Sequence, residues 1–276
     1  MEPKVSILIL NYLTYQDTLN LIDMAKMKIG YRNYDIIVVD NASPNESAQI
    51  LEEKSHEKGY FFIANPINSG YAAGNNLGIK QAIKLKSKYI LVMNNDILIT
   101  DNEFIDKMVN LCEGNKKIGA VSPKIIKPLG NEELQFFERP TMWDLSFGYV
   151  QFHKRRKTLN SDQIVKIYRP QGCCMLLSAK AVQDVNYMDE RTFLYGEEDI
   201  LAERLLNQGY ECWLYGKSKV IHNHSVTVSS TMSKIRKASI SLGGFRIYLK
   251  EYRNIHNIVL LKLLEIFKFL VVVIRD

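Results

Sequence analysis

The feature that most constrains this 276-residue chain is an alternation of short apolar runs with stretches of helical spacing. The runs are almost uninterrupted by polar residues and fall at residues 5–10, 36–39, 60–64, 89–93 and 118–122. Strands of a parallel sheet are buried on both faces, so they read as continuous apolar runs. The first 125 residues therefore predict an α/β fold, with a mostly parallel central sheet and helices on both of its faces.

Helices are predicted between these runs, and some begin or end with a recognisable signal. Thr14 and Asp17 have the spacing of a capping box. The turn cluster at 40–45 precedes a helix that runs to about residue 58 and stops at Gly59. The other predicted elements are helices at 74–86, 102–113 and 197–208 and strands at 172–178, 210–214 and 219–222.

Polar clusters follow the apolar runs that end at Leu10, Val39, Ala64 and Met93. In a parallel sheet these clusters share the edge formed by the carboxyl ends of the strands, where ligands bind in such folds. Two of the polar residues are carboxylates, and each has two readings.

Asp96 directly follows a strand. It either caps the helical segment near residue 101 or, with Asn95, holds a divalent cation on a diphosphate, because hard cations take oxygen ligands. Asp40 either caps the next helix or accepts hydrogen bonds from a ribose or base.

The glycine-rich phosphate-binding patterns are missing from the sequence: no GxGxxG follows a strand, and no GxxxxGK[ST] occurs. The segment 68–76, NSGYAAGNN, leads into a helix instead. Its two glycines, Gly70 and Gly74, and its three amides suit a close approach of the backbone to a polar ligand.

A second group of chemically competent residues lies in the later half. Glu197, Glu198 and Asp199 stand at a predicted helix start, where the helix dipole favours negative charge. They either cap the helix or repel one another enough to leave one as a general base. His222 and His224 end a predicted strand and are either structural or metal ligands.

Taken together and in order, these segments resemble glycosyltransferase family 2, the inverting enzymes with a GT-A fold, and in particular the rhamnosyltransferase-like subset of bacterial cell-surface polysaccharide synthesis. The resemblance rests on VSILILNY (5–12), IIVVDNAS (36–43), NSGYAAGNN (68–76), YILVMNND (89–96), GCCMLLS (172–178), FLYGEEDILAERL (193–205) and IHNHS (221–225).

The resemblance implies roles for the donor half of the site. The nucleoside of a dTDP- or UDP-sugar would contact Asp40, and the donor pocket would comprise Asn11, Tyr12, Asn41, Gly70, Asn75, Asn94 and Asn95. The Asn94-Asn95-Asp96 segment stands where the family carries Asp-x-Asp, with Asn94 replacing the first Asp. Asp96 and His222 would hold Mg²⁺ or Mn²⁺.

The resemblance also implies the reaction. Glu198 stands at the position of the catalytic base, and Glu197 is the second choice. A single displacement would invert the anomeric carbon while the acceptor, a glycan or a lipid-diphosphate-linked sugar, loses its proton. The implied catalytic domain spans 1–225, with a nucleotide-sugar half at about 1–125 and an acceptor half at about 126–225.

The irregular region at 127–170 contains Pro128, Pro140 and the basic cluster 154–157. It reads either as a solvated loop or as a variable flap that binds the acceptor. The four cysteines include no CxxC pair, so we expect reduced and mostly buried thiols and a cytoplasmic location.

The net charge of +6 belongs to one end of the chain. Residues 217–276 hold eleven Lys or Arg against three Asp or Glu, whereas the first 216 residues hold 25 against 27. The last stretch, 255–276, is largely apolar and is interrupted by Lys262, Glu265 and Lys268. Residues 226–276 therefore form a helical tail that either packs on the catalytic domain or lies on the anionic inner face of the plasma membrane.

Three other function classes are less well supported. A sugar-phosphate nucleotidyltransferase would carry a glycine-rich basic loop after the first strand, where this chain has Asn11-Tyr12-Leu13-Thr14. A non-catalytic binding protein would lack the acidic residues. Nucleic acid is not expected as a partner, because the basic tail is mixed with long aliphatic runs that suit lipid better than a phosphate backbone.

Overall fold

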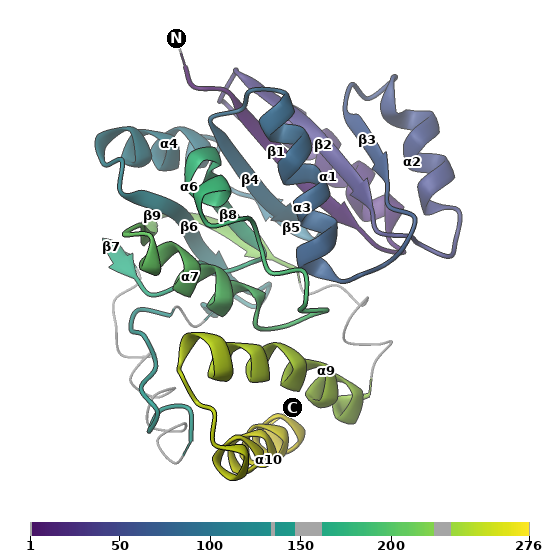
Figure 1. The fold of residues 1–276 in the computed structure, drawn as a ribbon. Helices are drawn as coiled ribbons and strands as arrows, with labels where there is room; N and C mark the ends of the chain where they lie inside the picture. The colour runs from purple at the N-terminus through teal and green to yellow at the C-terminus, as the bar shows by residue number, and fades with distance from the viewer. Residues whose placement is uncertain (1, 134–135, 147–161, 224–232, 276) are drawn as a thin grey trace.

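The computed structural model describes residues 2–133, 136–146, 162–223 and 233–275 (Figure 1). Within them, one nine-stranded sheet has the order β3-β2-β1-β4-β8-β6-β9-β5, with β7 paired to β9. The strands are β1 (Val5–Asn11), β2 (Tyr34–Asp40), β3 (Phe61–Ala64), β4 (Tyr89–Asn94), β5 (Ile97–Ile99), β6 (Ile118–Ile126), β7 (Ile164–Ile167), β8 (Cys174–Ser178) and β9 (Glu211–His222).

Helices surround the sheet and continue beyond it. They are α1 (Tyr15–Lys28), α2 (Ser47–Ser55), α3 (Tyr71–Lys84), α4 (Phe104–Gly114), α6 (Ala179–Asp184), α7 (Glu197–Asn207), α9 (Lys234–Ile247), the π-helix η1 (Tyr248–Tyr252) and α10 (Ile258–Arg275). The predicted α/β architecture is confirmed, including the helical C-terminal segment.

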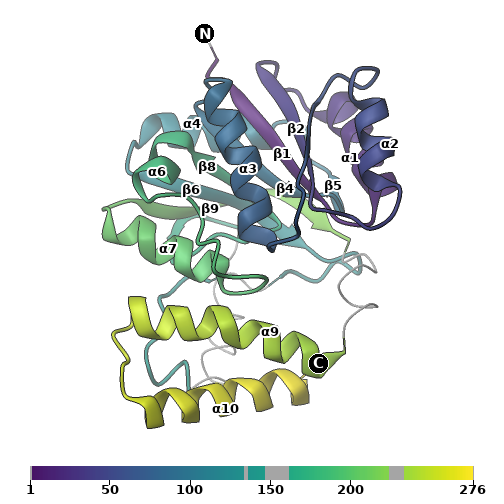
Figure 2. The ribbon, with the colours of Figure 1, turned by 45° about the vertical axis from the view of Figure 1, so that its right-hand side comes forward.

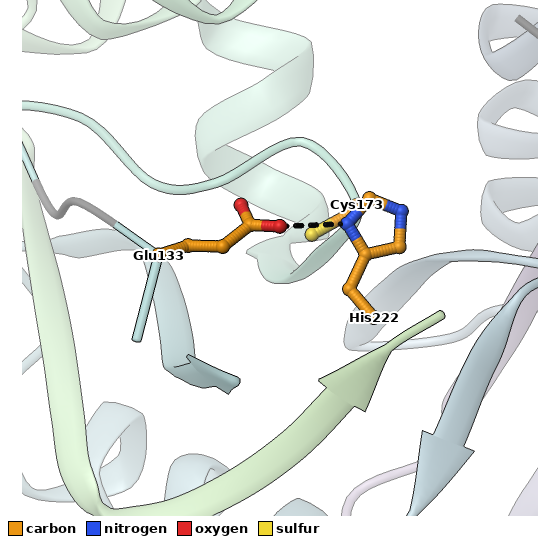
Figure 3. Close-up of side chains that lie close together, drawn as sticks. All are labelled: Glu133, Cys173 and His222. Carbon is orange, nitrogen blue, oxygen red and sulfur yellow. Dashed lines mark hydrogen bonds and ion pairs between the residues drawn. The ribbon is translucent and has the colours of Figure 1, made fainter. Parts of the chain in front are cut away.

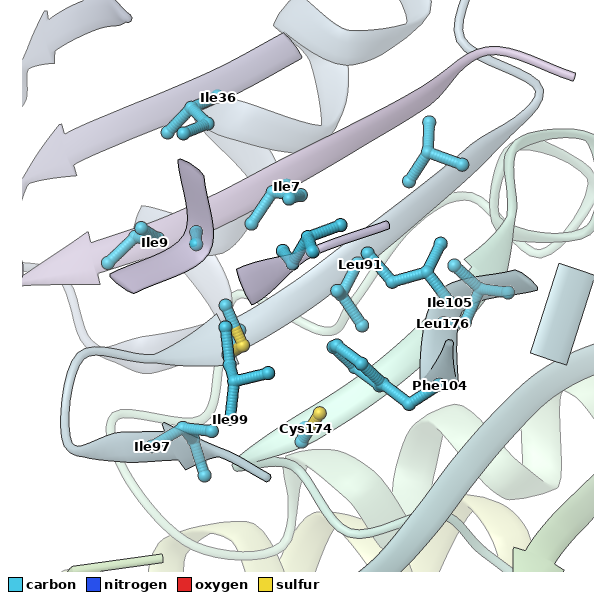
Figure 4. Close-up of a cluster of buried hydrophobic side chains, with 14 of the residues drawn as sticks. Ile7, Ile9, Ile36, Leu91, Ile97, Ile99, Phe104, Ile105, Cys174 and Leu176 are labelled. Carbon is cyan, nitrogen blue, oxygen red and sulfur yellow. The ribbon is translucent and has the colours of Figure 1, made fainter. Parts of the chain in front are cut away.

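The two faces of the sheet bury separate apolar cores, which explains the continuous apolar strands. Ile7 and Ile9 of β1 point into a core completed by helices α1, α2 and α4 (Figure 4). Leu8, between them, points to the opposite core under α3, α6 and α7. Successive side chains of a strand alternate between faces, so every position of a doubly covered strand must be apolar.

Strand direction is the main difference from the sequence prediction. β1, β2, β3, β4, β6 and β9 run one way, while β5, β7 and β8 pair antiparallel with their neighbours. The short strands expected at 210–214 and 219–222 are one strand, β9. Its pairing with β6 changes register between Pro123 and Lys124, so residues 216–218 bulge without ending the strand.

The predicted capping box at the start of α1 does not form. Thr14 is the N-cap residue, yet its side chain makes no cap hydrogen bond. Its hydroxyl accepts a hydrogen bond from the side-chain amide of Asn95 at 2.8 Å instead. A tertiary contact has therefore replaced the local one.

Helices α9 and α10 pack against each other at one end of the molecule, with α10 outermost (Figure 2). A third apolar cluster joins this pair to the α/β body through Ile200 of α7. None of the helices in the described residues is both long and apolar enough to cross a bilayer.

The expected thiol state is confirmed for the structure: all four cysteines are free, and Cys112, Cys174 and Cys212 are buried. The basic cluster 154–157, residues 134–135 and 147–161 of the expected acceptor flap, and His224 lie outside the described residues.

Candidate active site

The register of the sheet places several of the predicted donor-binding residues side by side at the ends of neighbouring strands. Asn11 at the end of β1 pairs with Asp40 at the end of β2, and Leu10 pairs with Asn94 at the end of β4. The carboxyl ends of three parallel strands therefore meet along one edge, as their apolar runs predicted.

Asp40 and Asn11 form a buried hydrogen-bonded pair at this edge. The Asn11 Nδ2 donates to Asp40 Oδ1 at 2.7 Å, and both side chains are essentially buried. The other carboxylate oxygen accepts from the backbone N–H of Ser43 at 2.9 Å. Asp40 thus shapes the turn after β2 and does not cap α2, which begins at Ser47. Tyr12, by contrast, keeps 39% of its surface exposed beside this pair.

A chain of hydrogen bonds connects this pair to the β4–β5 turn. Asn11 Oδ1 accepts from the Thr18 hydroxyl at 2.8 Å, and Asn95 Nδ2 donates to that hydroxyl at 3.0 Å. Asn95 is therefore held from the side of α1, and its neighbour Asp96 is positioned by the same turn. Because α4 begins at Phe104 with Glu103 as its N-cap, the helix-cap reading of Asp96 is wrong.

The segment 68–76 leads into α3, and both of its glycines pack closely against other parts of the chain. Gly70 has φ +104°, and a Cβ there would lie 2.3 Å from the backbone oxygen of Phe193. A Cβ at Gly74 would lie 2.7 Å from the Leu10 side chain. These contacts explain both glycines by packing, whereas the sequence pattern was interpreted as a ligand approach.

The amides of this region divide into two groups. Asn41 donates to the Asn68 side chain at 3.0 Å and to the Gly70 carbonyl at 3.3 Å, which ties the β2 loop to α3. Asn75 is fully buried and donates to the Tyr71 carbonyl of its own helix at 2.9 Å. Asn75 therefore supports the start of α3 from inside.

Asp96 and His222 are brought together as predicted. The antiparallel pairing of β5 with β9 sets Ile97 opposite His222, and Asp96 Oδ1 lies 3.2 Å from His222 Nε2. Burial disfavours the charged ring, but hydrogen bonds to Asp96, Cys173 and Glu133 outweigh it and raise the pKa of His222 to about 12. The ring is thus placed among electron-rich groups that would equally suit a cation.

The donor atoms of this pair fit a divalent metal ion. Adjacent ligands of an octahedral ion with bonds of about 2.1 Å lie roughly 3 Å apart, close to the Asp96–His222 spacing. Carboxylate oxygen and imidazole nitrogen are both suitable ligands for Mn²⁺. Asp96 and His222 are therefore the residues that could hold the ion.

The acidic group occupies the first turn of α7, after Gly196 in the left-handed conformation. Glu197 is buried, and burial followed by repulsion from Glu198 raises its pKa to about 8. Glu198 is more accessible, with 21% of its side chain exposed. The two neighbouring carboxyls therefore differ in environment: Glu197 is buried with a raised pKa, and Glu198 is partly exposed.

Arg169 is a charged site residue that the sequence interpretation missed. Its Nε lies 2.8 Å from Asp199 Oδ1, and its Nη1 lies 4.0 Å from Glu198 Oε1. The guanidinium stacks 3.3 Å from the ring centroid of Phe136. It is a buried cation in contact with the acidic turn.

Two consecutive residues join the acidic turn to the Asp96–His222 pair. Gly172 lies against Glu198, because a Cβ at this position would be 2.5 Å from Glu198 Oε1. The next residue, Cys173, hydrogen-bonds to the His222 ring and accepts the backbone N–H of Asn94 at its carbonyl, 2.8 Å away. Tyr71 donates to the Gly172 carbonyl at 2.8 Å from the other side. The candidate base and the candidate metal ligands therefore belong to one site.

This geometry defines an α/β enzyme with amide-rich loops at the sheet edge, a metal-competent Asp–His pair and an adjacent acidic turn. The model of the family Glycosyl transferase family 2 matches residues 6–185, more than half of the sequence. The chain belongs to this family, and it is a glycosyltransferase.

Known proteins agree with this assignment. The hexosyltransferase Agl10 of low-salt glycan biosynthesis in Haloferax volcanii is 26% identical over 227 residues, which are 82% of this chain and 69% of that protein. The O-antigen biosynthesis protein RfbC of Myxococcus xanthus is 24% identical over 242 residues, covering 82% of this chain and 18% of RfbC. This chain therefore spans less than a fifth of the length of RfbC.

Among solved structures, the mannosyltransferase PcManGT from Pyrobaculum calidifontis, in complex with GDP-Man and Mn²⁺, superposes with a TM-score of 0.65. The sequences are 13% identical, and the match covers 99% of this chain and 73% of PcManGT. The likeness confirms the GT-A fold.

Proposed function

We propose that this glycosyltransferase moves a sugar, with rhamnose as one candidate, from a dTDP- or UDP-sugar to a glycan or lipid-diphosphate-linked acceptor, with inversion at the anomeric carbon. The observation that carries the proposal is the Gly172–Cys173 link, which sets Glu198 beside the Asp96–His222 pair. The relatives Agl10 and RfbC, described in glycan and O-antigen biosynthesis, support a role in surface polysaccharide synthesis.

Each part of the site has a role in this proposal. The nucleoside of the donor contacts a pocket lined by Asp40, Asn11, Tyr12 and Asn41. The turn that positions Asp96 includes Asn94 and Asn95. Asp96 and His222 would hold Mg²⁺ or Mn²⁺, which when bound offsets the charge that develops on the leaving diphosphate.

Glu198 is the proposed base. Its carboxylate accepts the proton of the acceptor hydroxyl as that oxygen attacks the anomeric carbon and the bond to the diphosphate breaks. The buried Arg169 guanidinium lies 4.0 Å from Glu198 Oε1, whereas Glu197 is buried and its pKa is raised to about 8. The environment of the two residues thus favours Glu198 over Glu197 for this role.

The experiment is a panel of nucleotide sugars with Mn²⁺ or with chelator, scored by donor binding and by sugar transfer. In Asp96→Ala the metal-dependent part of donor binding should be lost. In Glu198→Gln donor binding should remain, while transfer falls by roughly 10²–10⁴-fold. Glu190→Gln, an exposed carboxylate on the segment before α7, is the matched control. Normal transfer by Glu198→Gln would reject this base.

The tail adds a proposal about location. Val259, Leu263, Ile266 and Leu270 recur at helical spacing along α10 and keep 49–69% of their surfaces exposed. Leu261 and Leu264, on the opposite face, are buried in the cluster shared with α9. An apolar stripe on a strongly basic segment suits the anionic inner face of a membrane, where a lipid-linked acceptor would be found.

A further inference from the structure

A side-chain cluster next to the Asp96–His222 pair has a different donor chemistry. A carboxylate oxygen of Glu133, the Cys173 Sγ and a ring nitrogen of His222 all lie within 4.8 Å of one another (Figure 3). Sulfur, nitrogen and oxygen in one cluster match the ligand set that Zn²⁺ takes in proteins. A small contraction would bring the three atoms to the spacing of tetrahedral Zn²⁺ ligands.

The three residues come from separate parts of the chain, and the fold fixes each of them. Cys173 directly precedes β8, and His222 is the last residue of β9. Glu133 follows a β-bridge between Ile126 and Glu132, and its backbone N–H donates to the Ile125 carbonyl at 2.9 Å. Ligands anchored on different elements converge only through the tertiary fold.

The two ring nitrogens of His222 face different carboxylates, one in the Glu133–Cys173 cluster and one at Asp96. Nδ1 lies 3.1 Å from Glu133 Oε1, whereas Nε2 lies 3.2 Å from Asp96 Oδ1. A neutral imidazole that binds a metal through Nδ1 carries its proton on Nε2, and this N–H then donates to a carboxylate. Asp96 stands at the correct place for that second contact.

We propose that Glu133, Cys173 and Nδ1 of His222 form an inhibitory Zn²⁺ site, with a water molecule as the fourth ligand. Binding releases the thiol proton of Cys173 to solvent, together with any proton on Nδ1, and the Zn–S, Zn–N and Glu133 Zn–O bonds replace all but one of the hydration waters of the ion. Nε2 then holds its proton toward Asp96 and cannot coordinate a second ion. Zn²⁺ here and Mn²⁺ or Mg²⁺ at Asp96 therefore exclude each other.

The difference in ligand chemistry gives the site its selectivity. Thiolate and imidazole ligands favour Zn²⁺ and Co²⁺, whereas Mg²⁺ prefers oxygen. The enzyme would consequently lose activity at Zn²⁺ concentrations far below those of the activating ion. Its transfer step would be governed by the ratio of the two metals.

The test uses the full chain after treatment with chelator and reductant, titrated with Co²⁺ as a spectroscopic substitute for Zn²⁺. The wild type should show a thiolate-to-cobalt charge-transfer band that saturates at one ion per chain and is displaced by Zn²⁺. Cys173→Ser should lose the band, and Glu133→Gln should bind Co²⁺ roughly tenfold more weakly. Cys112→Ser, at a buried thiol in the main core, is the matched control and should keep the band.

Absence of the band in the wild type, or its persistence in Cys173→Ser, would overturn the proposal. If Cys173→Ser does not fold, the Co²⁺ affinity of Glu133→Gln, which leaves the thiol intact, tests the site instead. Unchanged affinity would then overturn the proposal. The binding measurements do not require a known donor, so their result is independent of the proposed transfer reaction. Where transfer is measurable, Zn²⁺ should inhibit the wild type, and excess Mn²⁺ should restore it.

Discussion

At the scale of single residues, the first turn of α7 contains neighbouring carboxyls in different environments. Glu197 is buried with a pKa raised to about 8, and Arg169 lies beside Glu198 and Asp199. A carboxyl with a raised folded-state pKa binds more protons in the folded than in the unfolded protein. Ionising Glu197 therefore costs stability between the unfolded value near 4.5 and the folded value near 8.

This asymmetry predicts a pH effect on folding. Between those two pH values, stability should fall by up to about 1.4 kcal/mol per pH unit through this one group. Glu197→Gln removes the titration, so its stability relative to the wild type should rise from pH 5 to pH 8.5 in urea unfolding. Glu53→Gln, on an exposed face of α2, is the control. A relative stability of Glu197→Gln that does not change with pH would contradict the raised pKa.

The contact between Gly172 and Glu198 supports a second prediction. In Gly172→Ala the new methyl group would lie 2.5 Å from Glu198 Oε1, and the flexible carboxylate should move away. Misplacing a catalytic group by about 1 Å can reduce turnover on the order of 100-fold. We expect donor binding and melting temperature to stay close to the wild-type values while kcat falls.

The matched variant is Gly114→Ala, because a Cβ there meets no atom within 4 Å. It should leave kcat unchanged. A Gly172→Ala enzyme with full kcat would show that the position of Glu198 does not govern the reaction.

Some of the site residues could be predicted from sequence, and others could not, for a physical reason. Asp96 lies between β4 and β5, and His222 is the last residue of β9, so strands fix where both side chains lie. Arg169 and Glu133 lie outside the predicted helices and strands, so no periodicity indicated where they would point. Their contacts exist only because the chain path returns them to α7 and β9.

At the scale of elements, the sequence predicted strands better than it predicted their directions. Apolar runs such as those of β1 and β4 indicate burial on both faces, and both strands are found. The three-residue strand β5 is too short to show a pattern, and the antiparallel direction of β8 depends on which neighbour it meets. Pairing of distant segments, and not local propensity, determines those features.

Helix α7 is tied to two distant segments by one buried carboxylate. Glu203 is fully buried and accepts two hydrogen bonds from Arg139 at 2.8 Å and one from the Tyr168 hydroxyl at 2.7 Å. The Tyr248 hydroxyl of η1 is 3.4 Å away. The helix that carries the acidic turn is thereby connected to the C-terminal segment.

Glu203→Gln should therefore destabilise the whole protein. The neutral amide cannot accept both Arg139 donors as strongly, so we expect a loss of about 1–3 kcal/mol in the free energy of unfolding. Glu57→Gln, which interrupts an exposed ion pair with Lys54, should leave stability almost unchanged, because exposed ion pairs are screened by solvent. Equal effects of the two substitutions, measured by urea unfolding, would show that the Glu203 network does not hold α7 in place.

At the scale of the whole molecule, charge and apolar surface are separated along the chain. The first 216 residues are slightly acidic, and residues 217–276 carry a net charge of +8, counted as eleven basic against three acidic residues. In the proposed reaction, a donor diphosphate at the sheet edge would therefore depend on a cation at Asp96 more than on a basic surface. The basic segment contains α9 and α10, which lie together at one end of the molecule (Figure 2).

If α10 contacts lipid, its exposed stripe should provide the apolar part of the binding energy. Leu263 and Ile266 are 59% and 56% exposed, so replacing both by Gln should leave the folded core intact. Each fully buried side chain of this kind contributes about 1.5–3 kcal/mol on leaving water, so losing both should weaken binding at least roughly tenfold.

The measurement is cosedimentation of the full chain with vesicles containing phosphatidylglycerol. Met27→Gln, at a 79% exposed position on α1, should bind as the wild type does. Higher salt should weaken all three proteins, because the basic residues contribute through screened attraction. Unchanged sedimentation of the double variant would exclude the stripe as the contact surface and leave it as an exposed face of the α9–α10 pair.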